Sequence, residues 1–329
     1  MKATAVANSN IALVKYWGKR DDKLILPQNG SISVALDGLS TTTTVEFGPH
    51  ERDIFILDGR ERTEEEAKRV FGQIDLIRER AGIGEKAKIV SENNFPTAAG
   101  LASSASGAAA LVVAAAAAAG IGLDKKGLSV LARRGSGSAC RSISGGFVEW
   151  LMGEREDGSD SYGKQIAKPE YWPDFRIITT VVSKTEKHVK SRAGMRQTVK
   201  TCPFYGCWLE SIGSDLKAVR NGIAEKDIAT VGSIAEMNAL KMHALMWTTK
   251  PSIVYWMPET LKIIQNIVIW RKEGLDCYFT IDAGPQVKII CLKKEVKEIE
   301  AKLKECLGKV EISQHAPGGD ARPINNHLF

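Results

Sequence analysis

Residues 100–107 of the chain, GLASSASG, combine two glycines with three serines directly before a long run of alanines. The alanine run predicts a helix, and a helix N-terminus carries unpaired N–H groups and a partial positive charge. Glycines let a ligand approach the backbone, and serine hydroxyls add hydrogen-bond donors and metal contacts. The stretch is therefore a candidate phosphate site. Close packing of a small-residue helix start against a sheet explains the same residues equally well.

Known phosphate motifs do not match this stretch. A Walker A loop would continue with Gly-Lys-Ser or Gly-Lys-Thr, and a dinucleotide-binding loop would show the GxGxxG spacing. A second stretch, RGSGSACR, also has suitable chemistry: Ser136 and Ser138 lie on a glycine turn that could bind an anion. In the same stretch, Arg141 offers a guanidinium that suits bidentate pairing with a carboxylate. A structural salt bridge is the simpler role for Arg141.

Asp282, in the sequence TIDAGP, is placed by its neighbours where a carboxylate could reach a ligand. The apolar residues before it predict a strand, and the glycine and proline after it predict a tight turn. The carboxylate would then point out of the edge of a sheet. An aspartate in a turn that bonds its own backbone is the competing interpretation.

The composition limits the class of protein. The 329 residues suffice for two ordinary domains or one large one. The formal net charge of +6 is spread along the chain, which favours a phosphorylated small molecule as much as a nucleic acid. The longest apolar run, Ala108 to Ala119, is too short to span a bilayer. We see no signal peptide pattern and expect a cytoplasmic location without membrane contact.

Cysteines and histidines show no metal-site pattern. The six cysteines lack a CxxC pair or zinc spacing, and the five histidines lack ligand spacing as well. We therefore expect free, buried thiols. It stays open whether Cys277 and Cys291 lie opposite each other in the hairpin around Asp282 and pair, and whether Cys202 pairs with Cys207.

The pattern of apolar residues predicts the elements that would position these side chains. In the first half we expect strands over residues 3–17, 31–47, 53–59, 86–96 and 145–153, and helices over 63–82, the alanine run and 124–137. In the second half we expect a strand over 174–183, helices over 191–227, 228–247, 258–274 and 294–308, and a strand–turn–strand unit over 276–292. No Pro/Ser-rich linker separates the halves, so they should share an interface.

Five motifs occur along the chain in a fixed order: NIALVKYWGKRD, PTAAGLASSASG, RRGSGSACRSISGGFVEW, SRAGM and TIDAGP. Together they closely resemble the mevalonate diphosphate decarboxylases of the GHMP kinase superfamily, and the similarity covers nearly the whole chain. The resemblance implies an α+β fold of the two-domain GHMP kinase type, with the active site in the interdomain cleft. It implies a first domain over residues 1–182, with the phosphate-binding loop, and a second over residues 183–329.

Enzymes of this family use ATP and Mg²⁺ to phosphorylate the tertiary hydroxyl of mevalonate 5-diphosphate. Phosphate and carbon dioxide then leave, and isopentenyl diphosphate remains. The chemistry is coherent, because phosphate is a good leaving group where hydroxide is a poor one. Its departure leaves positive charge at the carbon beta to the carboxylate, which drives loss of carbon dioxide. The resemblance also implies a homodimer that binds this small molecule and no nucleic acid.

The resemblance assigns roles to individual residues of this sequence. Asp282 would take or orient the hydroxyl proton, and Arg141, held by Asn10, would bind the substrate carboxylate. Lys19 would lie close to the diphosphate or to Asp282. Ser104 would orient the γ-phosphate of ATP. The other implied contacts are to ATP, from Ala102, Ser103, Ser106 and Gly107, and to the substrate, from Tyr16, Ser136, Ser138, Ser191 and Arg192.

Three other functions fit part of the pattern. A relative acting on mevalonate 5-phosphate would give isopentenyl phosphate, and the positions suited to a diphosphate argue against it. A kinase-only mevalonate 3-kinase relative would not decarboxylate, and the presence of Asp282, Lys19 and Arg141 argues against it. An RNA-binding protein would explain the charge but not the site. The chain departs from the family at Gln286, where asparagine is usual, and we expect little effect on the turn.

Overall fold

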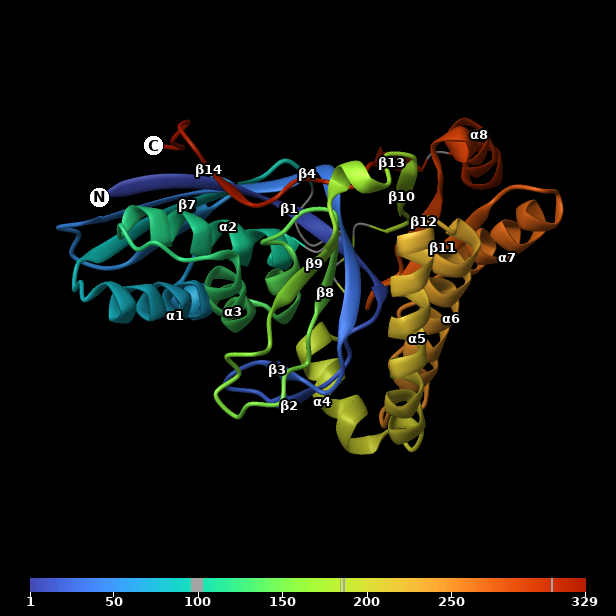
Figure 1. Ribbon diagram of the computed structural model, residues 1–329, viewed down its shortest axis with the longest axis horizontal. Helices are drawn as coiled ribbons and strands as arrows, with labels where there is room; N and C mark the ends of the chain where they lie inside the picture. The colour runs from blue at the N-terminus through green and yellow to red at the C-terminus, as the bar shows by residue number, and fades with distance from the viewer. Residues whose placement is uncertain (96–102, 184, 186, 309) are drawn as a thin grey trace.

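The computed structural model describes residues 1–95, 103–183, 185, 187–308 and 310–329. The molecule has two lobes side by side, each built on its own β-sheet (Figure 1). A short hairpin of β2 (Lys19–Asp21) and β3 (Leu26–Pro27) projects from the first lobe toward α4 of the second. The two lobes thus meet along one side of this hairpin.

The first lobe is built on an eight-stranded sheet. Six strands follow the order β14–β1–β4–β7–β5–β6, while β8 pairs with the start of β4 and β9 pairs with β8. β5 and β7 are parallel, and the other described pairings are antiparallel, so the sheet is mixed. The strands are β1 (Lys2–Val14), β4 (Ser31–Gly48), β5 (Ile54–Leu57), β6 (Arg60–Glu61), β7 (Lys86–Asn93), β8 (Phe147–Trp150), β9 (Gly163–Ala167) and β14 (Arg322–Ile324).

Three helices cover one face of this sheet: α1 (Glu64–Ala81), α2 (Ser103–Ala118) and α3 (Lys125–Gly135) (Figure 1). α1 begins with a capping box, in which the Thr63 hydroxyl accepts from the Glu66 N–H and the Glu66 carboxylate accepts from the Thr63 N–H. Most of the alanines of α2 are buried, because small side chains let this helix lie close to β1 and β4. The 3₁₀ turn η1 (Gly137–Arg141) follows α3 directly.

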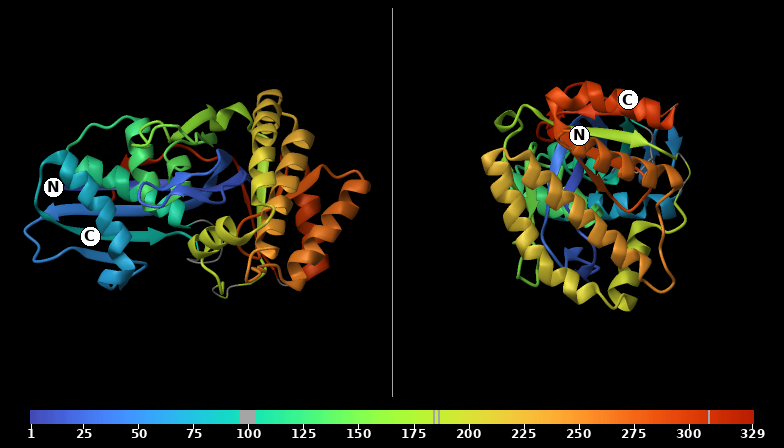
Figure 2. Two further views of the ribbon diagram at one scale, coloured as in Figure 1. Left: turned by 90° about the horizontal axis from the view of Figure 1, so that it is seen from below. Right: turned by 90° about the vertical axis from the view of Figure 1, so that its right-hand side faces the viewer.

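The second lobe has a four-stranded antiparallel sheet in the order β11–β12–β10–β13, covered by long helices (Figure 2). Its strands are β10 (Phe175–Val181), β11 (Cys277–Ile281), β12 (Val287–Leu292) and β13 (Glu311–His315). Its helices are α4 (Ser191–Thr201), α5 (Tyr205–Glu225), α6 (Ile228–Trp247), α7 (Pro258–Lys272) and α8 (Val296–Leu307). Two 3₁₀ turns, η2 (Pro169–Tyr171) and η3 (Lys293–Glu295), complete this half.

Apolar packing joins the lobes. One buried cluster lies under α1, α2 and α3, and another lies between α7, α8 and the second sheet. A third cluster takes side chains from both lobes, among them Leu13 of β1, Val34 of β4, Ile212 of α5 and Met242 of α6. The interface predicted from the absence of a linker is therefore a continuous core, and the cavity between the lobes has firm walls.

The observed elements differ from the predicted ones in a few places. The single helix expected over residues 191–227 is two helices, because Pro203 follows α4 and cannot continue it. Cys277 and Cys291 do lie opposite each other in the β11–β12 pairing, and all six cysteines are free thiols. The helices in the described part of the chain are too short or too polar to cross a membrane.

The division of the chain at residue 182 remains a proposal. The sheets suggest one refinement of it, since β10 precedes that position yet belongs to the second sheet. β14 lies near the end of the second half, yet it pairs with β1 in the first sheet. The chain therefore passes from the first lobe to the second and returns.

Candidate active site

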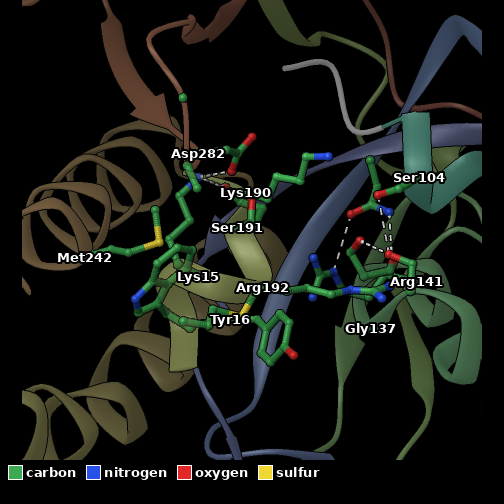
Figure 3. Close-up of a pocket in the computed structure, with 18 of the residues that line it drawn as sticks. Lys15, Tyr16, Ser104, Gly137, Arg141, Lys190, Ser191, Arg192, Met242 and Asp282 are labelled. Carbon is green, nitrogen blue, oxygen red and sulfur yellow. Dashed lines mark hydrogen bonds and ion pairs between the residues drawn. The ribbon is translucent and has the colours of Figure 1, made fainter. Parts of the chain in front are cut away.

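A cavity of about 430 Å³ opens between the lobes, and most of the predicted site residues line it (Figure 3). Its walls come from β1, the start of α2 and η1 in the first lobe. The segment before α4, the first turns of α4, and the β11–β12 hairpin close it from the second lobe. Its size is within the range of ordinary small-molecule sites.

Positive charge dominates the described lining of the cavity. Asp282 is the one carboxylate among these lining residues. The basic lining residues are Lys15, Lys19, Arg69, Arg141, Lys187, Lys190, Arg192 and Lys288. Such an excess of cations in a partly enclosed space favours a ligand with several negative charges.

Asp282 follows β11 directly and is held by two lysines. Lys15 Nζ lies 2.7 Å from its Oδ1, and Lys288 Nζ lies 3.2 Å from its Oδ2. Burial alone would raise the pKa of the Asp282 carboxyl, but the two ammonium groups outweigh burial and hold that pKa well below its usual range. Asp282 is therefore ionised at any pH at which the protein would work, and its carboxylate is fixed at both oxygens.

Lys15 is a buried cation at the end of β1. Its side-chain ammonium also donates to the Ala12 carbonyl, at 2.8 Å, and its backbone N–H donates to Asn238 Oδ1 at 2.7 Å. Burial lowers the pKa of Lys15 to about 8, although the neighbouring Asp282 carboxylate opposes this change. The Lys15 ammonium is thus the group at this site that is closest to losing its proton near neutral pH.

His243 supports the Asp282 turn from α6. Its Nε2 lies 3.2 Å from the Asp282 backbone carbonyl, so Nε2 carries the proton and donates it. Burial, together with the charge of Lys15, lowers the pKa of His243 to about 3. The ring is therefore neutral at neutral pH.

Arg141 lies at the first-lobe wall of the cavity, where η1 meets the sheet. It is buried, and its guanidinium donates to Ser31 Oγ at 2.5 Å, Ser33 Oγ at 3.0 Å and Asn10 Oδ1 at 3.4 Å. Asn10 is itself fixed by a 2.7 Å bond to Ser142 Oγ. The predicted contact between Asn10 and Arg141 is thus present, and Arg141 is held by hydroxyls rather than by a protein carboxylate.

In the described part of the chain, four hydroxyls line the cavity from the first lobe, those of Tyr16, Ser104, Ser136 and Ser138. Ser136 Oγ lies 3.4 Å from both Ser104 Oγ and Ser138 Oγ, so the start of α2 and the turn before η1 form one polar rim. The Tyr16 hydroxyl is buried without a hydrogen-bond partner among the described residues. A Cβ on Gly137 would lie 2.8 Å from the Trp150 ring, so this turn needs glycine to fit beside Trp150.

The second lobe contributes the start of α4. Lys187 Nζ donates to Ser191 Oγ and to the Ala283 carbonyl, both at 2.8 Å, and so links this segment to the Asp282 turn. Arg192 reaches across the cavity and donates to the Gly135 carbonyl of the first lobe at 2.7 Å. Burial lowers the pKa of Arg192 to about 10, which leaves it charged at neutral pH.

Two expectations about individual side chains need adjustment. Lys19 lines the cavity but pairs with Asp22 at 2.9 Å, and Lys15 is the lysine that contacts Asp282. Ser106 is buried against the sheet, where its hydroxyl lies 2.7 Å from Thr41 Oγ1, so it faces away from the cavity. The physical reason is helix periodicity, which places Ser106 on the sheet side of α2 when Ser104 faces out.

The residues expected to bind ATP can be placed only in part. Ala102 lies outside the described residues. Ser103 and Gly107 belong to the first turns of α2, and Ser104 is the member of this group that lines the cavity. A Cβ on Gly107 would meet open space, so close packing does not explain its lack of a side chain.

The described residues fit Mg²⁺ that is held mainly by the phosphates of ATP and by few protein groups. Mg²⁺ usually keeps several waters and takes few protein ligands when phosphates are present. Among the described residues, no group of three or more His, Cys, Asp or Glu could hold a metal ion, and both oxygens of Asp282 face lysines. The Ser104 hydroxyl lines the described cavity at the start of α2, so it would be a ligand for Mg²⁺ that binds with the phosphates.

Sequence reasoning missed five cationic residues of the cavity: Lys15, Arg69, Lys187, Lys190 and Lys288. Lys15 and Lys288 carry a signal that could have found them. Each is a single lysine inside an apolar stretch, IALVKYW and QVKIICL, and a lysine in a core strand needs a buried anion as partner. Arg69, on a polar face of α1, has no comparable signal.

The two-lobed α+β architecture, with the start of α2 and the Asp282 carboxylate both lining the cleft, is that of an enzyme of the GHMP kinase type. A family model of the diphosphomevalonate decarboxylase-like N-terminal domain matches residues 7–163, and a model of the mevalonate 5-diphosphate decarboxylase C-terminal domain matches residues 177–325. The diphosphomevalonate decarboxylase of Ganoderma lucidum is 40% identical over 323 residues, which cover 91% of this chain and 80% of that protein. The chain belongs to the diphosphomevalonate decarboxylase family.

Solved structures agree with this assignment. The crystal structure of mevalonate diphosphate decarboxylase from Staphylococcus aureus has a TM-score of 0.94 to this chain at 40% identity and covers 98% of both chains. A structure of MDDEF in complex with MVAPP, AMPPCP and magnesium has a TM-score of 0.93 at 40% identity and covers 99% of both. The two-domain GHMP kinase fold predicted from the motifs is confirmed.

Proposed function

We infer that the chain catalyses the ATP-dependent decarboxylation of mevalonate 5-diphosphate to isopentenyl diphosphate, releasing ADP, phosphate and carbon dioxide. The observation that carries this function is the position of Asp282, clamped between two lysines at the floor of a strongly cationic cleft. The substrate bears a diphosphate at one end and a carboxylate at the other, and ATP adds three phosphates. A cavity with eight basic lining residues suits this load of negative charge.

Asp282 would act on the tertiary hydroxyl. A carboxylate whose pKa is held so low is a weak base, so it serves the ground state by accepting a hydrogen bond from the hydroxyl and aiming its oxygen at the γ-phosphate. The hydroxyl becomes acidic only as its oxygen bonds to phosphorus, and the proton can pass to Asp282 at that stage. Mg²⁺, when bound, neutralises phosphate charge during the transfer.

The other residues divide between the two ends of the substrate. Arg141 has no protein carboxylate as partner among its described hydrogen bonds, which supports pairing with the substrate carboxylate. Ser136, Ser138, Ser191 and Arg192 also line the cavity and would bind the diphosphate. Tyr16, whose buried hydroxyl has no partner among the described residues, would donate to the substrate as well.

Product analysis tests this function. Purified protein is given ATP and Mg²⁺ with mevalonate 5-diphosphate or mevalonate 5-phosphate, and ADP and carbon dioxide are measured. We expect both products from the diphosphate, and kcat/KM about ten- to several-hundredfold lower for the monophosphate, because one or two charge-assisted hydrogen bonds are lost. Equal use of the monophosphate would replace this assignment by a phosphomevalonate decarboxylase, and ADP without carbon dioxide would indicate a kinase alone.

Two wider expectations remain proposals: a homodimer, which the resemblance implies, and a cytoplasmic location, which the sequence pattern favours. Assembly as a homodimer would be measured by sedimentation of the purified chain over a range of concentrations. A cytoplasmic location would be measured by fractionation of the source cells. Neither measurement depends on turnover, so both are independent of the product analysis.

A further inference from the structure

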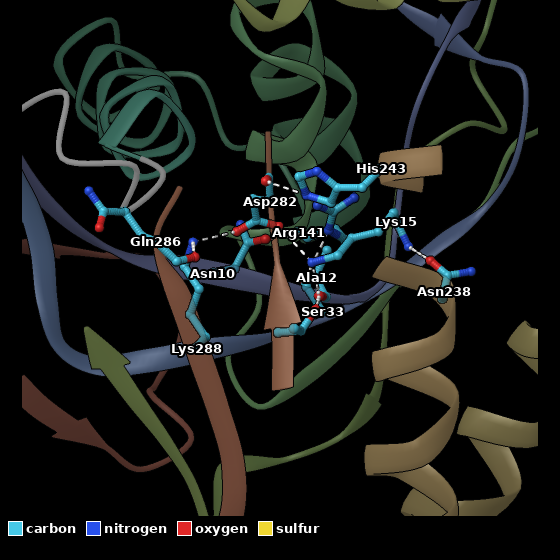
Figure 4. Close-up of polar contacts among 11 residues, drawn as sticks. Asn10, Ala12, Lys15, Ser33, Arg141, Asn238, His243, Asp282, Gln286 and Lys288 are labelled. Carbon is cyan, nitrogen blue, oxygen red and sulfur yellow. Dashed lines mark hydrogen bonds and ion pairs between the residues drawn. The ribbon is translucent and has the colours of Figure 1, made fainter. Parts of the chain in front are cut away.

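β12 carries a buried lysine among apolar residues. Lys288 is 1% exposed, and it lies between Val287 and Ile289, which are also buried. Its ammonium lies 3.2 Å from Asp282 Oδ2 and 3.3 Å from the Gln286 carbonyl (Figure 4). A buried ammonium is costly unless it is paired, so its position at this carboxylate requires an explanation.

Lys15 and Lys288 approach Asp282 from different lobes. Lys15 directly follows β1 of the first sheet, and Lys288 lies in β12 of the second sheet. Each ammonium takes one carboxylate oxygen. With one lysine, the carboxylate could rotate about its Cβ–Cγ bond and still keep its ion pair, whereas with two it is fixed in one orientation.

We propose that Lys288 is a positioning residue of the decarboxylation reaction, which fixes the Asp282 carboxylate in the orientation that aims the substrate hydroxyl at ATP. Lys288 acts through Asp282, and Lys15 holds the opposite oxygen. The proposal rests on the function proposed above. Lys288 therefore contributes to turnover and little to substrate affinity, because its ammonium pairs with the Asp282 carboxylate and not with the substrate.

Other charged or titratable groups face this contact. Figure 4 shows Lys15, which follows β1, Arg141 from η1 and His243 from α6. The fourth group is Lys187, from the segment before α4. Three of these are cations, and His243 is neutral. Asp282 is therefore surrounded by positive charge, and removing one lysine leaves it ionised but no longer fixed in place.

The test compares Lys288→Met with Lys293→Met. Lys293 is exposed just beyond the end of β12, so its replacement removes the same charge from the same segment without touching Asp282. We expect Lys288→Met to lower kcat about 10- to 100-fold with both KM values within about threefold of wild type, because misplacement of a reacting group acts on turnover. Lys293→Met should match the wild type. A folded Lys288→Met protein with kcat within about twofold of wild type, or with a loss confined to KM, would overturn the proposal.

A double variant keeps the proposal testable if Lys288→Met is unstable. Asp282→Asn leaves Lys15 and Lys288 as like charges beside each other in a buried site, so its Tm should fall. Adding Lys288→Met should raise that Tm and should not lower the residual kcat further. A lower Tm or an additive loss of kcat in the double variant would contradict the proposed coupling. The Tm comparison needs no turnover, so it reports the coupling between Lys288 and Asp282 even if an inactive wild type refutes the proposed function.

Discussion

At the scale of single residues, Lys15 connects the charge state of the site to pH. Burial lowers the pKa of Lys15 to about 8, while Asp282 keeps its charge over the whole working range. Loss of the Lys15 proton would leave Asp282 with Lys288 alone. The orientation of the carboxylate then depends on pH through Lys15 and not through its own protonation.

We predict that kcat/KM falls as pH rises through about 8, because kcat/KM reports groups of the free enzyme. The phosphate groups of the substrates titrate near pH 6, so they do not account for a fall in kcat/KM near pH 8. In Lys15→Arg, the guanidinium keeps its charge, so the fall in kcat/KM near pH 8 should disappear, even if activity is lower overall. The test is to measure kcat/KM from about pH 6 to about pH 10 for the wild type and for Lys15→Arg. The same fall in the arginine variant would contradict the prediction.

The stability effect of Lys15 has the opposite sign. Its pKa is lower in the folded protein than the value of about 10.4 in an unfolded chain. The unfolded chain therefore binds the proton more tightly, and the contribution of Lys15 to the free energy of unfolding increases between about pH 8 and about pH 10.4. A fall in kcat/KM over this range cannot come from unfolding caused by Lys15.

Ser104 is the described residue of the serine-rich stretch that reaches the cavity. We predict that Ser104→Ala lowers kcat by roughly 10²- to 10³-fold, the usual loss when one donor to developing charge is removed. Alanine is a good helix former, so the Tm should hold. Ser106→Ala is the contrasting variant, because it breaks the 2.7 Å contact with Thr41 and should reduce stability more than it reduces kcat. Equal kcat in the wild type and Ser104→Ala would contradict a phosphate-binding role for this stretch and favour a role in packing.

Sequence alone located some of the site residues and missed others, even within one motif, because Asn10 and Lys15 both lie in NIALVKYWGKRD. Asn10, Arg141 and Asp282 were found because the motifs around them are specific, and the structure brings all three to the cavity. Lys15 and Lys288 were missed because a period-two pattern assigns a face to a residue but does not say what that face meets. Both lysines pair with Asp282. Asp282 is far from Lys15 in the sequence and is separated from Lys288 by a turn.

At the scale of elements, the turn after β1 is shaped by the second lobe. Gly18 has φ of +109°, and a Cβ there would lie 1.9 Å from the Tyr205 hydroxyl of α5. That hydroxyl donates to the Trp17 carbonyl at 2.7 Å. The turn presents Tyr16 and Lys19 to the cavity, so α5 helps to place substrate-facing side chains that belong to the first lobe.

We predict that Gly18→Ala lowers the free energy of unfolding by roughly 2–4 kcal/mol, because both the backbone conformation and the space exclude a side chain. KM for the diphosphate substrate should rise as well. Gly72→Ala is the matched control, since Gly72 lies within α1, where a Cβ would meet no atom within 4 Å, and alanine favours a helix. Thermal melts and steady-state kinetics provide the measurements. A Gly18→Ala protein as stable as wild type would show that the turn can relax.

Elements with caps or strong periodicity were predictable, and short edge strands were not. α1 and α6 occupy nearly the predicted residues, because Thr63, Gly82 and Asp227 mark their ends. β9, β13 and β14 were missed, since pairing with a neighbouring strand rather than local propensity makes them strands. The strand β14 contains a proline, which is acceptable at a sheet edge.

At the scale of the whole molecule, charge gathers in the cleft between the lobes. The net charge of +6 is modest for 329 residues, yet eight basic residues line one cavity. A partly enclosed cavity with one sign of charge concentrates the field and increases the encounter rate with anions. The sequence predicted an acidic partner from the net charge, but the concentration of that charge depends on how the lobes pack.

We predict that added salt lowers kcat/KM more than it lowers kcat. Raising the ionic strength from about 0.05 M to about 0.5 M shortens the Debye length to a few ångströms and screens the approach of both anionic substrates. Contacts inside the closed site are screened less, so kcat should change little. Initial rates over a series of salt concentrations, repeated with a second salt of different anion, measure the effect. A kcat that fell in parallel with kcat/KM would point to salt acting on the reaction step or on stability.

The path of the chain also sets an order for its synthesis and folding. β1 leaves the ribosome first among the strands, and its edge partner β14 leaves last, with the whole second lobe between them. The first sheet can build its centre early from β1, β4 and β7, but the β1 edge stays unpaired until residues 322–324 emerge. An unpaired strand edge can pair with another chain. The nascent protein is therefore most exposed to misassembly while its second lobe is being made, and the last strand to be translated removes that exposure.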